Sequence, residues 1–171
     1  MMDVQEMIGR LRANAEIIRT LVQPVSDEQA NWKPDSQTWS LRETMEHVYN
    51  EERIDFRQHL MEMLSDPPLA WGALDGEGYL IVKDCRRALE LFLKEREDSL
   101  VWLQGLGETD WTVKQDVTYD SVPEIYTHSA GDVLVSWVAH DFLHLRQMNE
   151  LLYAWNVHQA SPYSVRYAGE W

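Results

Sequence analysis

The sequence has little of what small secreted or zinc-clustered proteins depend on, since its 171 residues include a single cysteine, Cys85. One cysteine excludes an intrachain disulfide and a cysteine-rich zinc site. No uninterrupted apolar run is long enough to span a bilayer. The N-terminal stretch MMDVQEMIGRLRANAEIIRTL carries charges every few residues and lacks the apolar centre of a signal peptide. We therefore expect a cytoplasmic protein that does not cross a membrane.

Positive charge is also scarce, because 15 Lys and Arg stand against 29 Asp and Glu, a formal net charge of −14. Such a surface repels phosphate backbones and anionic lipids, so neither nucleic acid nor a membrane is an expected partner. Eight tryptophans and seven tyrosines indicate a packed core rather than disorder. The length is that of one domain, and residues 1–171 are expected to form a single domain.

Apolar residues recur at helical spacing along almost the whole chain. The pattern predicts four long helices, at Val4–Leu21, Ser40–Leu64, Tyr79–Leu103 and Ser129–Asn156. The intervening stretches predict a connector with a short helical turn at 24–39, a loop at 67–78, a short strand or extended crossover at 108–128, and an extended tail at 158–171. Four amphipathic helices with a long connection between the third and the fourth predict an all-α four-helix bundle with a crossover.

The placement of the histidines is the main chemical signal. His140 and His144 lie four residues apart on one helix face, so both rings can reach one metal ion. His47, on the second predicted helix, supplies a third nitrogen if the two helices are neighbours. Three neutral imidazoles are a suitable ligand set for Zn²⁺ or Ni²⁺ and leave open positions, where water or a thiol can bind and lose a proton. The alternative is that the pair is only two partly buried polar residues at a helix interface.

Other polar residues near these histidines are weaker candidates. Gln147 and Asp141 are candidate hydrogen-bond partners for the ligands, although Asp141 points about 100° away from the neighbouring histidine around the helix. Glu51, four residues after His47, could assist or replace a histidine, with a solvated helix charge as the alternative. His59 lies about 120° from His47 around the same helix and is not expected to share its site.

Two familiar metal patterns do not fit this sequence. The segment 140–144, HDFLH, has the outline of the zinc-protease motif H-E-x-x-H, but Asp141 replaces the glutamate base with a shorter side chain. A di-iron carboxylate bundle needs a Glu-x-x-His pattern on two helices, and Thr44 and Trp137 occupy the positions of those glutamates. We therefore exclude both a protease and a di-iron protein.

The run WSLRETMEHV at 39–48, followed on the last helix by HDFLH at 140–144 and then Gln147, resembles the DinB-like superfamily. The resemblance covers the chain from the first helix to about Trp155. It implies a four-helix bundle with a crossover, commonly a homodimer, whose metal ligands correspond to His47, His140 and His144. It also relates the chain to bacillithiol S-transferases and to the metal domain of mycothiol-dependent maleylpyruvate isomerase.

This resemblance implies a metal-dependent thiol S-transferase or hydrolase that acts on a small molecule. In a transferase a low-molecular-weight thiol would be the cosubstrate, because a metal-bound thiol is deprotonated and nucleophilic. Cys85 is then not required, and we expect it to be a small core residue. A non-catalytic stress-response or interaction protein that retains the metal-binding bundle stays open as an alternative. The sequence identifies neither the substrate nor a catalytic residue.

Overall fold

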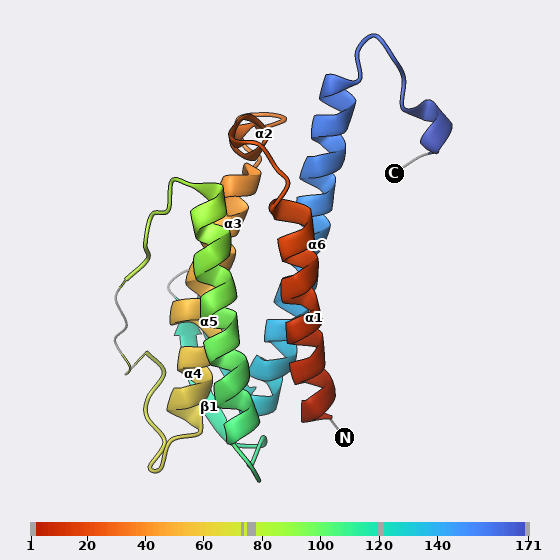
Figure 1. Cartoon of the computed structure of the whole chain (residues 1–171). Helices are drawn as coiled ribbons and strands as arrows, with labels where there is room; N and C mark the ends of the chain where they lie inside the picture. Colours follow the sequence, from red (N-terminus) through yellow and green to blue (C-terminus); the bar gives the residue numbers. More distant parts are fainter. Residues whose placement is uncertain (1–2, 73, 75–77, 120–121, 170–171) are drawn as a thin grey trace.

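The computed structural model describes residues 3–72, 74, 78–119 and 122–169 (Figure 1). The long helices are α1 (Val4–Val22), α3 (Leu41–Ile54), α4 (Phe56–Met63), α5 (Cys85–Gly105) and α6 (Ala130–Gln159). Helix α1 packs on α5 and α6, α3 packs on α5 and α6, and α4 continues the line of α3 against α6. The predicted four-helix bundle is confirmed, with α3 and α4 together as its second helix. None of the described helices is long and apolar enough to cross a membrane.

Capping boxes start two of the helices where the sequence predicted them. The Ser40 hydroxyl accepts a hydrogen bond from the Glu43 backbone N–H at 3.2 Å, and the Glu43 carboxylate accepts one from the Ser40 backbone N–H at 2.7 Å. Ser129 and Asp132 form the same reciprocal pair at 3.1 and 2.8 Å at the start of α6. These two boxes begin the helices that carry all three candidate metal ligands.

The predicted helix from Ser40 to Leu64 is wrong in one respect, because it is interrupted at Asp55 (φ −115°, ψ −93°). The break is short: the Asp55 backbone N–H donates to the Glu51 carbonyl at 3.1 Å, and the His59 N–H donates to the Asp55 carbonyl at 2.9 Å. The apolar periodicity continues through the break, so it cannot reveal the change of backbone conformation.

The helix predicted to begin at residue 79 begins at Cys85, because α3 holds the preceding segment 78–82 in an extended form. The side-chain amide of Asn50 donates to the Leu80 carbonyl at 2.9 Å and accepts from the Leu80 N–H at 2.8 Å. Glu46 accepts a further backbone N–H from the segment at 2.8 Å. These bonds satisfy backbone groups that a helix would otherwise satisfy internally.

The expected crossover contains an antiparallel hairpin of β1 (Lys114–Tyr119) and β2 (Val122–Ser129), which pairs Lys114 with Ser129. The hairpin lies at the opposite end of the bundle from the short helix α2 (Asp27–Asn31) (Figure 1). Helix α6 extends beyond the predicted end, and the tail contains a 3-10 turn (Arg166–Ala168). Residues 170–171 of the predicted tail and residues 73 and 75–77 of the predicted loop lie outside the described residues.

A buried polar layer divides the apolar core into two clusters. Each helix of the bundle contributes one residue to it: Asn14 from α1, Glu52 from α3, Arg96 from α5 and Asp141 from α6, each at most 2% exposed. The Arg96 guanidinium binds both carboxylate oxygens of Asp141 at 2.8 Å and one oxygen of Glu52 at 2.8 Å. The Asn14 amide donates to Asp141 at 3.2 Å. The layer thus connects all four helices at one height.

Candidate metal centre

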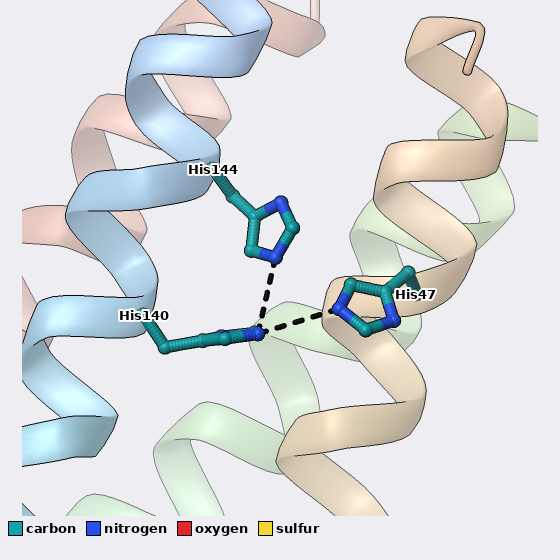
Figure 2. Close-up of side chains that lie close together, drawn as sticks. All are labelled: His47, His140 and His144. Carbon is teal, nitrogen blue, oxygen red and sulfur yellow. Dashed lines mark hydrogen bonds between the residues drawn. The ribbon is translucent and has the colours of Figure 1, made fainter. Parts of the chain in front are cut away.

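The three candidate ligands meet between α3 and α6, with His47 on the first helix and His140 and His144 on the second (Figure 2). The Nε2 atom of His140 lies 3.3 Å from Nε2 of His47 and 3.0 Å from Nε2 of His144. Each ring offers one nitrogen as a metal ligand, and these three nitrogens all lie within 4.8 Å of one another. Two nitrogens bound to one zinc at about 2.0–2.1 Å and at a tetrahedral angle stand about 3.3 Å apart. Two of the three separations are close to this value, so the donor set suits a single divalent ion.

All three imidazoles are held in the neutral form that binds metals. Burial, reinforced by the charge of the neighbouring imidazoles, lowers the pKa of His47 to about 4 and that of His140 to about 3. Burial also lowers the pKa of His144, although its hydrogen bond with Gln147 and the charge of Asp141 oppose this shift. Close to neutral pH the nitrogens are therefore available as lone-pair donors without first losing a proton.

Polar side chains lie at the far side of two of the rings, and one of them forms a hydrogen bond that sets the orientation of its ring. His144 Nδ1 lies 2.8 Å from Oε1 of Gln147, which accepts its proton and leaves Nε2 as the donor atom that faces the other rings. The Gln147 partnership was predicted. His47 Nδ1 lies 3.6 Å from Oε1 of Glu51, which is half-buried beside the ring rather than on a fully solvated face. Burial, followed by the influence of Asp55, raises the pKa of Glu51 to about 8.

Two other residues considered in the sequence belong to the core beside the centre. Asp141 points away from the histidines, as its position around the helix predicted, and binds Arg96. Trp137 is 1% exposed, and its indole N–H donates to Glu52 at 2.9 Å. Both therefore support the helices that carry the ligands without facing them.

Aromatic side chains border the histidines, and the sequence reasoning missed this role. The ring of Trp39 lies 5.1 Å from that of His47, and the ring of Phe56 lies 5.1 Å from that of His140. Phe56 follows the break at Asp55, and its apolar character alone marked it as a core position. No spacing in the sequence distinguishes such a bordering ring from an ordinary core residue.

His59 and Cys85 lie outside the centre, as expected. His59 Nδ1 binds the Asp55 carboxylate at 2.8 Å, and its ring stacks on Trp71 with centroids 3.8 Å apart. Cys85 is buried in the core, and burial raises the pKa of its thiol to about 11. Its thiol is thus protonated at neutral pH and is not a nucleophile at this site.

A family model described as DinB superfamily matches residues 10–148. The chain belongs to the DinB superfamily. Among solved structures, this DinB-superfamily chain is similar to YfiT from Bacillus subtilis, described as a probable metal-dependent hydrolase with an unusual four-helix bundle topology, with a TM-score of 0.68 and 15% sequence identity. The match covers 90% of this chain and 87% of that chain, and at this identity it shows a shared fold. No curated protein sequence matches significantly.

Proposed function

We propose that this chain is a metal-dependent hydrolase of small molecules that holds Zn²⁺ or Ni²⁺ through His47, His140 and His144. The observation that carries the proposal is the convergence of three neutral imidazoles from two helices, with two Nε2 separations of 3.0 and 3.3 Å. The description of the YfiT structure as a probable metal-dependent hydrolase supports the reaction class. The acidic surface favours a small-molecule substrate over nucleic acid.

The chain's own residues position and isolate the centre. A divalent ion on three imidazoles keeps open positions and lowers the pKa of water or a thiol bound there. Gln147 fixes the ring of His144, and the Glu51 carboxyl group lies 3.6 Å from the ring of His47. Trp39 places apolar surface beside His47, and Phe56 places apolar surface beside His140, which strengthens electrostatic interactions where it displaces water.

Thiol transfer is the alternative reaction at the same centre. The chain's only thiol, that of Cys85, is enclosed in the core, so a transferred thiol must be an external low-molecular-weight cosubstrate. A series of activated aryl esters and alkyl halides, assayed with and without glutathione, distinguishes the reactions. Product formed without thiol supports hydrolysis, and strict dependence on thiol supports transfer. Full metal loading with no turnover supports a non-catalytic stress-response or interaction protein.

Metal content tests the ligand assignment directly. Protein purified without a histidine tag should contain one divalent ion per chain by elemental analysis, and His144→Ala should lose it while its helical circular dichroism is retained. His158→Ala is the matched control, because it removes an exposed histidine from the same helix and should keep the metal. An unchanged metal content in His144→Ala would contradict the assignment.

A homodimer is the assembly we propose for this chain. Helix α6 leaves four large apolar side chains exposed, Val135 at 46%, Phe142 at 46%, Leu143 at 58% and Val157 at 42%. Exposed apolar side chains gathered on one helix are typical of a protein interface. Light scattering should report a dimer for the wild type and a monomer for Leu143→Glu. A wild-type monomer at micromolar concentration would refute this assembly.

A further inference from the structure

The helices that carry the histidines continue towards the hairpin end of the bundle. Asp55 and His59 follow His47 at intervals that are multiples of four, and Ser136 precedes His140 by four residues on α6. Four residues of helix correspond to about 6 Å along its axis. Ser136 therefore lies about one helical turn from His140, while Asp55 and His59 lie about two and three turns from His47.

A cavity of about 240 Å³ occupies this region, and its lining includes Asp55, Phe56, His59, Trp71 and Ser136. Pockets for drug-sized ligands measure about 300–1,000 Å³, so this cavity has room for a single small ring and not for a peptide or nucleotide. Phe56 connects it to the centre, because its ring both lines the cavity and lies 5.1 Å from the ring of His140.

The aromatic walls of the cavity are fixed by contacts of their own. His59 is held by Asp55 at 2.8 Å, and Trp71 stacks on it with an angle of 14° between the ring planes. Phe56 stacks on the buried Trp137 with centroids 5.8 Å apart and an angle of 7°. A cavity whose walls are ordered in advance loses little side-chain entropy when a ligand enters.

We propose that this cavity binds a flat aromatic ring of the substrate, joined directly or through one bond to the group that reacts at the histidines. The proposal rests on the proposed function and names its substrate class: small aromatic acyl compounds such as aryl esters or amides, rather than aliphatic ones. Aromatic walls favour a ring through offset and edge-to-face contacts as well as through the apolar area that it buries. A short linkage is required because Phe56 both lines the cavity and lies 5.1 Å from the ring of His140.

Two hydroxamates, which both chelate a divalent ion through the same pair of oxygens, separate ring binding from metal binding. With Ni²⁺-loaded protein, calorimetry should show benzohydroxamate binding about tenfold or more tightly than acetohydroxamate, a factor that needs only about 60 Å² of additional buried apolar surface. Ser136→Phe fills the cavity from an exposed position on α6 and should abolish this ratio without weakening acetohydroxamate binding. Val101→Phe, at an exposed position on α5, is the matched control and should keep the ratio.

Equal affinity for the two hydroxamates, or a ratio that survives in Ser136→Phe, would overturn the ring site while leaving the metal site intact. Failure of both hydroxamates to bind loaded protein would instead count against the proposed function. The ring site has a test without metal: benzamide should shift the indole resonance of Trp71 in wild-type protein and not in Ser136→Phe. The absence of that shift would also overturn the proposal.

Discussion

The guanidinium of Arg96 is the buried group whose loss should destabilise the bundle most. It is 1% exposed, and its two terminal nitrogens bind the carboxylates of Glu52 and Asp141 and donate to the Leu11 carbonyl at 2.9 Å. Arg96→Met keeps much of the side-chain volume but leaves two buried carboxylates without a cation. Removing one partner of a buried ion pair costs about 3–5 kcal/mol. That loss is a large part of the about 5–15 kcal/mol by which domains are commonly stable.

Urea unfolding followed by circular dichroism measures this loss on metal-free protein. For a chain of this length, 3–5 kcal/mol corresponds to a decrease in melting temperature of about 6–20 °C. Arg10→Met is the matched control, because Arg10 pairs with Glu6 while both side chains are about half exposed, and exposed pairs contribute about 0–1 kcal/mol. The triple variant Arg96→Met, Glu52→Leu, Asp141→Leu should recover most of the lost stability, because it removes the uncompensated charges.

A loss below about 1 kcal/mol for Arg96→Met, no larger than that of an exposed pair, would refute this reasoning. It would mean that water or protons reach the Glu52 and Asp141 carboxylates at little free-energy cost, and that the stability of the polar layer does not depend on its ion pairs. A triple variant less stable than Arg96→Met would also refute the reasoning, since the deficit would then come from lost packing and from the unpaired donors of Trp137 and Asn14, and not from unpaired charge.

The other predictions concern single residues. Gln147→Leu should weaken Ni²⁺ or Zn²⁺ binding about 10–100-fold in equilibrium dialysis with little change in fold, because Gln147 orients His144; unchanged affinity would contradict this role. Burial lowers the pKa of His47 from the ordinary 6.5 to about 4. The metal-free folded state therefore binds fewer protons than the unfolded chain between these values, so its free energy of unfolding should fall as the pH drops from about 6.5 to about 4. Urea titrations at several pH values should show a weaker dependence in His47→Gln. The Cys85 thiol, with a pKa of about 11, should react with a disulfide reagent at pH 8 only after urea unfolds the chain; rapid reaction of folded protein would argue against its burial.

Local signals in the sequence predicted the starts of two helices and the pairing of two histidines on one helix face. Ser40 and Ser129 are good N-caps with an acidic residue three positions later, a signal that depends only on neighbouring residues. The pairing of His140 with His144 follows from helix geometry alone. The approach of His47 to that pair depends on the packing of two helices that are distant in the sequence. The sequence predicted it only through the resemblance to a family in which those two helices are neighbours.

The parts that the sequence did not predict all depend on contacts between distant segments. The segment before Cys85 is extended because Asn50 and Glu46 bind its backbone, and its β-branched residues Ile81 and Val82 disfavour a helix only slightly. The break at Asp55 carries no glycine or proline to mark it. Trp71 comes from a loop with no periodicity, so its stacking on His59 could be found only in three dimensions.

The buried ion pairs that join the helices lie at the same height along the bundle as the three histidines. Asp141 follows His140 directly on α6, yet the two side chains point to different sides, one towards Arg96 and one towards His47. Arg96 thereby ties α6 to Glu52 of α3, the helix that carries His47. A metal ligand set from two helices tolerates errors of only about half an ångström, so it requires a fixed axial register. Apolar packing alone allows the helices to slide along one another, whereas a bidentate ion pair at one height does not. The buried charges, whose desolvation is costly, therefore fix the axial register of the helices beside the candidate metal centre.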